Sequence, residues 1–319
     1  MKQYRCGRSG LVLPAMTLGF WHSFGDNVPY EVQKSIMCRA FDLGIYHFDL
    51  ANCYGPPDGA AEDAFARVFH SQLQGHRDEI LIATKAGAPL GDHPYQSGGS
   101  AKHLISNIDK SLRRMNLDYV DIFYHHLPDP DTDIQETADA LSRIVRQGKA
   151  LYIGVSNYSP EQLEDITEIL RENKTPCVIC QSSYSMLNQD YAKNGLADVV
   201  QRNHMGSIAY SVLAQGVLTG KYSKGIPKDS RIAVDPRYIQ ADAITDEVTN
   251  KVHALTELAV HRSQSLAQMA LAWAKYTGKF TSVLIGASRP SQVDENVAAL
   301  GRMDFSEDEL DAIQRILAE

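Results

Sequence analysis

The chain has 319 residues, of which 44% are hydrophobic, 22% charged and 8% aromatic, and these proportions exclude an intrinsically disordered or collagen-like protein. Its formal net charge is −8, from 31 Lys and Arg against 39 Asp and Glu, which argues against a nucleic acid or an anionic membrane as partner. We therefore expect a globular protein that binds any anionic ligand through local basic groups.

Strand-like runs recur along the chain. A hairpin, with runs at 4–6 and 11–13 around a Ser9-Gly10 turn, is expected first. From there short β-type runs alternate with amphipathic helical stretches. The eight runs that follow the hairpin lie at 16–19, 46–49, 80–85, 119–124, 151–155, 178–181, 207–210 and 282–285.

Helix signals fill the intervals between these runs. Ser100, Ser159 and Ser306 each stand where a hydroxyl can cap a helix N-terminus, and Ser306 opens a final helix at 308–318. Strands that alternate with helices predict a parallel sheet with right-handed crossovers. Eight such units predict an α/β fold, a (β/α)8 TIM barrel with an N-terminal β-hairpin and an additional C-terminal helix, in a single domain over residues 1–319.

Two longer segments interrupt the alternation, 87–99 after the third predicted barrel strand and 214–243 after the seventh. Long loops in compact folds are usually lids or ligand clamps. Both follow the C-terminal ends of strands, where barrels carry their sites. We expect both to border the binding site.

Cys177 and Cys180 form a CxxC pair, which invites a zinc or redox interpretation. The pair lies in an apolar strand-like run, where residues three apart point to opposite faces. We therefore expect no metal site, and structural thiols in a reducing cytoplasm. The first residues carry no secretory pattern and no apolar run reaches membrane-spanning length, so a cytoplasmic protein without membrane contact is expected.

Polar residues stand at three successive strand ends. Asp49 and Tyr54 follow the second barrel strand, Lys85 ends the third and His126 ends the fourth. Each alone is more often a cap, a rim residue, a solvated charge or a core histidine. Because neighbouring strand ends converge in a barrel, we expect the four side chains to meet.

This set suits proton donation to a carbonyl oxygen. A free tyrosine has a pKa of about 10, and an ammonium about 4 Å away can lower that pKa by as much as ~3. Asp49 would supply the counter-charge for Lys85, and His126 would orient the carbonyl or join the proton relay. Since no side chain supplies a hydride, a nicotinamide cofactor is implied.

No G-x-G-x-x-G motif follows a predicted strand, so the cofactor is expected across the barrel mouth rather than on a Rossmann unit. Amide and hydroxyl groups at Ser156, Asn157 and Gln181 can bind a carboxamide, and Tyr210 can stack on a flat ring. The small residues of 211–220 offer backbone amides to a pyrophosphate, with Lys221 and Arg231 as cationic clamps.

The run Gly286-Ala287-Ser288-Arg289 leads into a predicted helix N-terminus, which is a phosphate-binding arrangement. Arg289 favours a 2′-phosphate and hence NADP(H) over NAD(H). Taken alone, Ser288 and Arg289 are better explained as a helix cap beside a surface arginine.

In these residues the chain resembles the aldo-keto reductases, along nearly its whole length and in the same order. The matching motifs are LGFW at 18–21, FDLANCYG at 48–55, TK at 84–85, VDIFYHH at 120–126, GVSNY at 154–158, LAQGVLTGKY at 213–222, and GASR at 286–289 with Gln292, Glu295 and Asn296.

The resemblance implies a catalytic tetrad of Asp49, Tyr54, Lys85 and His126, with Tyr54 as general acid and with His125 pointing to the other face. It implies NADPH-dependent reduction of small aldehydes or ketones to alcohols. The cofactor contacts that it implies are Trp21, Ser156, Asn157, Gln181, Tyr210, Ser211, Leu213, Gln215, Gly216, Lys221, Arg231, Gly286, Ser288, Arg289, Gln292, Glu295 and Asn296.

Within the family the chain is most similar to the branch that holds potassium-channel beta subunits and bacterial L-glyceraldehyde 3-phosphate reductases. The loop Gly55-Pro56-Pro57 resembles that of the reductases, and the channel subunits carry asparagine at the position of His126. Both features favour a working reductase over a slow-turnover, redox-sensing regulatory subunit. The branch implies a homotetramer or homo-octamer and leaves the substrate open among glyceraldehyde 3-phosphate, methylglyoxal and other small carbonyls.

Overall fold

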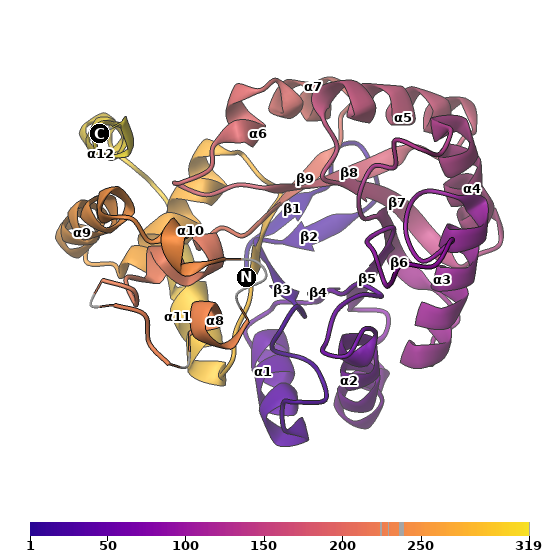
Figure 1. Cartoon of the computed structure of the whole chain (residues 1–319), viewed down its shortest axis with the longest axis horizontal. Coiled ribbons are helices and arrows are strands. Elements are labelled where there is room, and N and C mark those ends of the chain that lie inside the picture. The colour runs from indigo at the N-terminus through magenta and orange to yellow at the C-terminus, as the bar shows by residue number, and fades with distance from the viewer. Residues whose placement is uncertain (224, 229, 236–238, 319) are drawn as a thin grey trace.

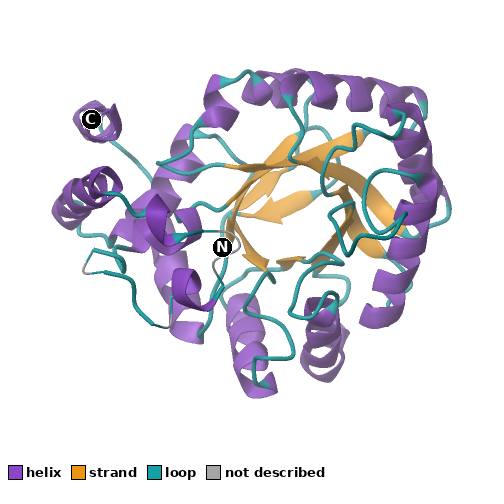
Figure 2. Cartoon of the chain, viewed as in Figure 1, coloured by secondary structure: helices purple, strands orange, loops and turns teal. Residues whose placement is uncertain are grey.

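The computed structural model describes residues 1–223, 225–228, 230–235 and 239–318, without the side chain of Arg231. Within these ranges eight parallel strands form one closed barrel, ordered β10-β3-β4-β5-β6-β7-β8-β9 (Figures 1 and 2). The predicted (β/α)8 barrel is confirmed, and each predicted strand end lies within two residues of the observed one. The strands are β3 Met16–Gly19, β4 His47–Asp49, β5 Leu81–Ala86, β6 Val120–His125, β7 Ala150–Ser156, β8 Cys177–Ser183, β9 Gly206–Tyr210 and β10 Ser282–Ile285.

The predicted N-terminal hairpin is present as β1 (Gln3–Arg5) and β2 (Val12–Pro14), paired antiparallel. It closes the end of the barrel at which the strands begin. The Cys6 thiol donates to the carbonyl of Val178 at 3.3 Å, and Leu11 and Leu13 join the cluster of apolar side chains inside the barrel. The other end, where the strands finish, is therefore the one left for a ligand.

Helices surround the barrel, and the three predicted caps form. Ser100 accepts from the backbone of His103, Ser159 forms a capping box, and Ser306 exchanges hydrogen bonds with Glu309. Each cap satisfies amide groups that a helix N-terminus leaves without partners. The helices are α1 Tyr30–Asp42, α2 Ala60–Val68, α3 Ala101–Met115, α4 Ile134–Arg146, α5 Pro160–Glu172, α6 Asp190–Lys193, α7 Leu196–Arg202, α8 Arg231–Val234, α9 Asp246–His261, α10 Leu266–Thr277, α11 Pro290–Ala298 and α12 Glu307–Ala318.

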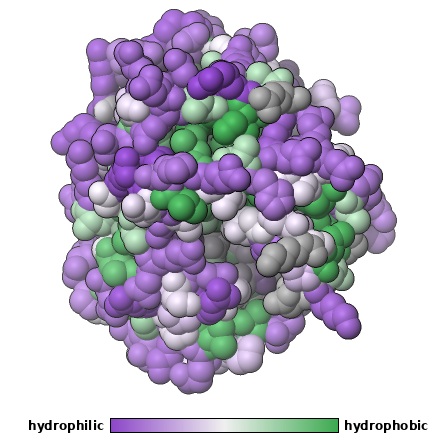
Figure 3. All heavy atoms as spheres, turned by 90° about the vertical axis from the view of Figure 1, so that its left-hand side faces the viewer, coloured by the Kyte–Doolittle hydropathy of each residue, from purple (hydrophilic) through white to green (hydrophobic). Residues whose placement is uncertain are grey.

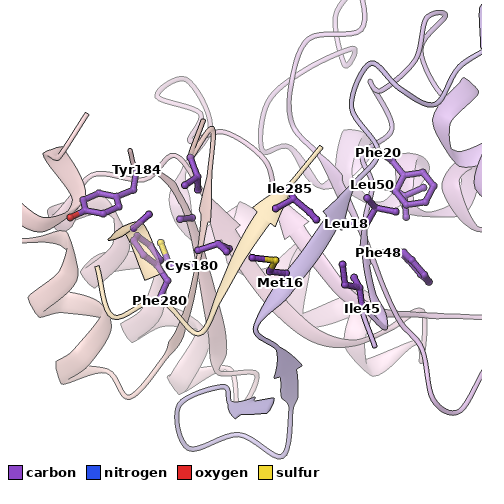
Figure 4. Packing of buried hydrophobic residues seen from close by; sticks show 14 of the residues in the cluster. Met16, Leu18, Phe20, Ile45, Phe48, Leu50, Cys180, Tyr184, Phe280 and Ile285 are labelled. Carbon is purple, nitrogen blue, oxygen red and sulfur yellow. The ribbon is translucent and has the colours of Figure 1, made fainter. Parts of the chain in front are cut away.

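The main hydrophobic core lies between the barrel and these helices (Figure 4). Phe20 stacks on Phe24 with ring centroids 3.9 Å apart, and its ring also meets Phe48 and Phe65 edge-on. Such aromatic pairs contribute beyond the area that they bury. This cluster packs the segment that leaves β3 against β4 and α2.

Cys177 and Cys180 are free, buried thiols, but the expectation that they point to opposite faces is wrong. The pairing of β7 with β8 shifts register between Ile153 and Gly154, because β8 carries one extra residue there. Both thiols belong to the core cluster outside the barrel, since the extra residue changes the alternation of side chains. Among the described residues, no group of three or more His, Cys, Asp or Glu could hold a metal ion.

The additional C-terminal helix α12 lies against α9, to one side of the barrel (Figure 1). Arg262, whose side chain is 1% exposed, binds the Glu309 carboxylate, the Gln264 side chain at 2.9 Å and the Asp304 carbonyl at 2.8 Å. Its guanidinium also lies 3.8 Å from the centre of the Phe305 ring. One buried cation thus anchors the segment that carries α12.

The face that carries α9 and α12 shows apolar residues in separate groups among polar ones (Figure 3). Val260 of α9 and Tyr276 of α10 are exposed, at 67% and 46%. Scattered surface hydrophobics of this kind are ordinary in globular proteins. Across the described ranges, no helix combines the length and apolarity needed to cross a bilayer.

We expect Arg262→Leu to lower the free energy of unfolding by about 3 kcal/mol, because it leaves the Glu309 carboxylate without its buried partner. Urea denaturation followed by circular dichroism measures the change. Arg315→Leu, at an exposed position of α12, is the control and should change stability by less than about 0.5 kcal/mol. Equal stability of the two variants would contradict the anchoring role.

Candidate active site

Lys85 stands at the centre of the polar cluster at the open end of the barrel. Its Nζ donates to Asp49 Oδ2 at 2.5 Å, to the Leu50 carbonyl at 2.8 Å and to the Tyr54 hydroxyl at 3.4 Å. Lys85 and Asp49 are both 0% exposed. Since β4 and β5 are neighbouring strands, the barrel alone brings the two charges together, and the ammonium faces a phenol with its counter-charge already bound.

Tyr54 lies in the loop between β4 and α2. Its amide donates to the Ala51 carbonyl at 3.1 Å, and its carbonyl accepts from Ala61 at 3.2 Å, which ties the loop down on both sides. The half-buried ring meets His126 edge-on, with centroids 5.9 Å apart. Tyr54 thus meets the Lys85 ammonium through its hydroxyl and His126 through its ring.

His126 follows β6 directly. Its amide donates to the Ala86 carbonyl and its own carbonyl accepts from Asn157 Nδ2, both at 2.9 Å. Burial, with smaller effects from Lys85 and His125, lowers the pKa of His126 to about 3. The imidazole is therefore neutral at physiological pH. The four residues predicted to meet do lie together in the structure.

His125 faces away from this cluster, as expected. It is 1% exposed, its Nδ1 lies 2.6 Å from the Tyr158 hydroxyl, and burial lowers its pKa to about 4. Its imidazole packs against the base of the 87–99 loop, where a Cβ on Gly87 would come within 3.1 Å of His125 Nε2. The Gly98 amide donates to the Gly87 carbonyl at 2.9 Å and so joins the two ends of that loop.

A second group of polar side chains reaches the same centre from β7, β8 and β9. Gln181 Nε2 donates to Asp49 Oδ1 at 3.1 Å, and Ser156 Oγ donates to the Gln181 carbonyl at 3.0 Å. Asn157 Nδ2 donates to Ser156 Oγ at 3.1 Å, and the Tyr210 hydroxyl donates to Asn157 Oδ1 at 2.5 Å. The four side chains proposed to surround a nicotinamide thus form a continuous chain beside the tetrad.

The segment after β9 has an unusual backbone. Ser211, Gln215 and Gly216 have φ of 54°, 57° and 94°, and Gln215 donates to Ser211 Oγ at 3.1 Å. A Cβ on Gly216 would come within 2.9 Å of Lys221 Nζ, so only glycine lets this ammonium lie so close to the backbone. Successive backbone amides in a turn of this kind can form a concave group that suits an anion. Leu213 is half-buried at the start of this turn.

The strand β10 leads into a helix N-terminus, as predicted. Ser288 donates from its amide to Gln292 Oε1 at 2.8 Å, and exposed Arg289 is the N-cap of α11, with Nε donating to Ser291 Oγ at 3.1 Å. Gly286 and Glu295 are exposed, whereas Asn296 is buried. Because β10 pairs with both β9 and β3, this turn lies at the same end of the barrel as the tetrad.

The loop after β9 also approaches the segment that follows β3. His22 Nδ1 lies 3.5 Å from Asp235, and the His22 ring packs on Trp21 with centroids 3.9 Å apart. Trp21 is half-buried at the rim. The predicted contact at Arg231 concerns a side chain outside the described residues.

Comparison with known proteins agrees with this arrangement. The model of a family described as "Aldo/keto reductase family" matches residues 15–318. The chain belongs to the aldo/keto reductase family. Its membership makes it an oxidoreductase, and the predicted family is confirmed.

Two groups of relatives within the aldo/keto reductases stand out. An L-glyceraldehyde 3-phosphate reductase of Escherichia coli (strain K12) is 50% identical over 99% of this chain and 93% of that protein. A probable voltage-gated potassium channel subunit beta of Arabidopsis thaliana is 33% identical over 94% of this chain and 91% of that protein. A putative subunit of the same kind from Schizosaccharomyces pombe is 33% identical over 93% of this chain and 88% of that protein.

Two contacts of this candidate site were not predicted from the sequence. Gln181 binds the Asp49 carboxylate directly, and Cys53 Sγ lies 3.8 Å from His126 Nδ1. The contact of Gln181 with Asp49 joins residues 132 positions apart. Their strands are not neighbours in the barrel, so no local sequence pattern predicts the contact. Adjacency to Tyr54 was a usable signal for Cys53.

We expect stability to fall as the pH drops from about 6.5 toward 4. His47, His125 and His126 have pKa values lowered to about 3, 4 and 3 by burial, so the unfolded chain takes up protons that the folded chain excludes. Each such histidine contributes a slope of up to about 1.4 kcal/mol per pH unit.

His125→Gln should therefore show a shallower dependence of unfolding free energy on pH than the wild type, even where its stability is lower. Urea unfolding at pH 7 and pH 5 measures the slope. The same exchange at exposed His253 of α9 is the matched control. A slope that His125→Gln leaves unchanged would show that His125 takes up its proton equally in both states.

Proposed function

We propose that this chain, as one domain spanning residues 1–319, reduces small aldehydes or ketones to alcohols with NADPH, and that Tyr54 is the general acid. The observation that carries the proposal is the Lys85 ammonium, which lies 2.5 Å from Asp49 Oδ2 and 3.4 Å from the Tyr54 hydroxyl. A buried cation at this distance favours the phenolate over the phenol, although the Asp49 carboxylate offsets part of that effect. Tyr54 is therefore the side chain that we assign as proton donor.

Each side chain of the tetrad has a distinct role in this proposal. Tyr54 donates its proton to the carbonyl oxygen as negative charge develops there, and Lys85 stabilises the phenolate that remains. Asp49 and the Leu50 carbonyl hold the ammonium in place. The neutral imidazole of His126 donates a hydrogen bond to the same oxygen. The nicotinamide, when bound, supplies the hydride.

The residues around the tetrad fit a nicotinamide cofactor. Gln181 and Ser156 keep hydrogen-bonding capacity beyond the bonds that they make to each other and to Asp49, and a carboxamide needs both a donor and an acceptor. The turn at 211–216 and the Lys221 ammonium suit a pyrophosphate.

The preference for NADPH rests on the turn between β10 and α11. Arg289 is exposed at the N-terminus of that helix, beside Ser288. A guanidinium there can bind the 2′-phosphate that distinguishes NADPH from NADH, and the helix N-terminus adds partial positive charge. Gln292, Glu295 and Asn296, on the first turns of α11, are proposed to bind the adenosine end.

The 50% identical relative named for L-glyceraldehyde 3-phosphate reduction makes that triose phosphate the first substrate to test, with methylglyoxal beside it. The channel-subunit relatives, at 33% identity, support a slowly turning regulatory subunit less strongly. Measured turnover with these carbonyls separates the two functions. The family resemblance also makes a homotetramer or homo-octamer the assembly that we propose.

Tyr54→Phe should lower kcat for carbonyl reduction by about 10²–10⁴-fold, because the proton donor is lost while the ring remains. The NADPH dissociation constant, measured by fluorescence titration, should change less than about threefold, since the hydroxyl serves the substrate rather than the cofactor. Tyr46→Phe is the control, because that hydroxyl binds the Val12 carbonyl at the opposite end of the barrel. Undiminished turnover in Tyr54→Phe would overturn the assignment of the acid.

Arg289→Ala should raise the dissociation constant for NADPH about tenfold or more, because one hydrogen bond between charged groups is lost. The constant for NADH should change by less than about twofold. Arg146→Ala, at the exposed C-terminal end of α4, is the matched control. An equal effect of Arg289→Ala on the two nucleotides would remove the argument for the 2′-phosphate.

A further inference from the structure

Cys53 precedes the proposed acid by one residue, and its thiol faces the catalytic histidine. The residue is half-buried, and its Sγ lies 3.8 Å from His126 Nδ1. That distance is within the range of a hydrogen bond to sulfur, a weak but directional interaction. The contact therefore bears on which ring nitrogen of His126 carries the proton.

The contact admits two directions, because the thiol can donate its S–H to a bare Nδ1 or its sulfur can accept from a protonated Nδ1. Burial raises the pKa of Cys53 to about 12, so the group is a thiol at neutral pH and carries an S–H donor. The pKa of His126 is lowered to about 3, so its ring is neutral and has one N–H and one bare nitrogen. If the thiol donates to Nδ1, the ring proton must be on Nε2.

The rest of the histidine is already fixed by other contacts. Its amide and carbonyl are bound by Ala86 and Asn157, and its ring lies edge-on to Tyr54. The charged neighbour Lys85 has donors only and directs them at Asp49, the Leu50 carbonyl and Tyr54. The tautomer is the one property of His126 that these bonds leave undetermined, because a neutral imidazole can carry its proton on either nitrogen.

We propose that Cys53 is a positioning residue that holds His126 in the tautomer protonated at Nε2, and so keeps an N–H available for the carbonyl oxygen that Tyr54 protonates. The catalytic consequence rests on the proposed function, whereas the tautomer itself does not. The role resembles that of groups which orient a histidine through its second nitrogen in metal and protease sites. Here a protonated thiol acts as the donor to that second nitrogen.

The direct test is nitrogen NMR of the full chain labelled with 15N-histidine, with the His126 signals assigned from a His126→Gln variant. In the wild type we expect Nδ1 to give the signal of a bare nitrogen and Nε2 that of a protonated one. In Cys53→Ala the Nδ1 and Nε2 signals should move toward each other as the second tautomer becomes populated, and Cys53→Ser should restore part of the difference. A protonated Nδ1 in the wild type would overturn the proposal. So would Nδ1 and Nε2 signals in Cys53→Ala that are unchanged from those of the wild type.

Kinetics provide the second readout. Cys53→Ala should lower kcat about two- to tenfold, the factor that one hydrogen bond supplies, with little change in the KM for NADPH and partial recovery in Cys53→Ser. Cys38→Ala, on α1, is the matched control. If wild-type turnover is absent, the proposed function fails while the NMR result still decides the role of Cys53. If turnover is present but all three variants equal the wild type, the positioning role fails alone.

Discussion

The ion pair of Lys85 with Asp49 is the interaction on which the site depends. Both charged side chains are fully buried, and removing them from water costs free energy. A buried pair of this kind therefore contributes little net stability compared with apolar packing. Its presence in the barrel therefore agrees with the proposed role of the ammonium beside the Tyr54 hydroxyl. The Leu50 carbonyl and Gln181 complete the hydrogen bonds of the pair, so neither charge lacks a partner.

The barrel makes this arrangement possible because parallel strands end at one rim. Asp49, Lys85 and His126 are far apart in the chain, yet β4, β5 and β6 are consecutive neighbours in the sheet. The opposite rim is closed by the β1–β2 hairpin, which packs Leu11 and Leu13 into the barrel. Barrels of this architecture generally carry their active sites at the end where the strands finish, whereas the opposite end contributes to stability.

Around the tetrad, polar contacts link side chains from neighbouring strands and from strands that the sheet does not pair. Gln181 on β8 reaches Asp49 on β4, and Asn157 after β7 holds both His126 after β6 and Tyr210 on β9. Asn157 itself has a φ of 63°, a conformation that asparagine tolerates better than most residues. These bonds join the proposed cofactor side of the mouth to the tetrad.

The sequence by itself determined the eight strands, the caps at Ser100, Ser159 and Ser306, and the meeting of Asp49, Tyr54, Lys85 and His126 at the strand ends, because periodicity and strand-end position are local properties of the chain. Only the tertiary structure decided the contact of Gln181 with Asp49 and that of Cys53 with His126, since side-chain direction at a loop or across a barrel follows from packing. The extra residue in β8, which places Cys177 and Cys180 in one cluster, is likewise a matter of strand register. Register depends on the pairing with the neighbouring strand. The alternation of residues along one strand therefore does not predict where an extra residue is accommodated.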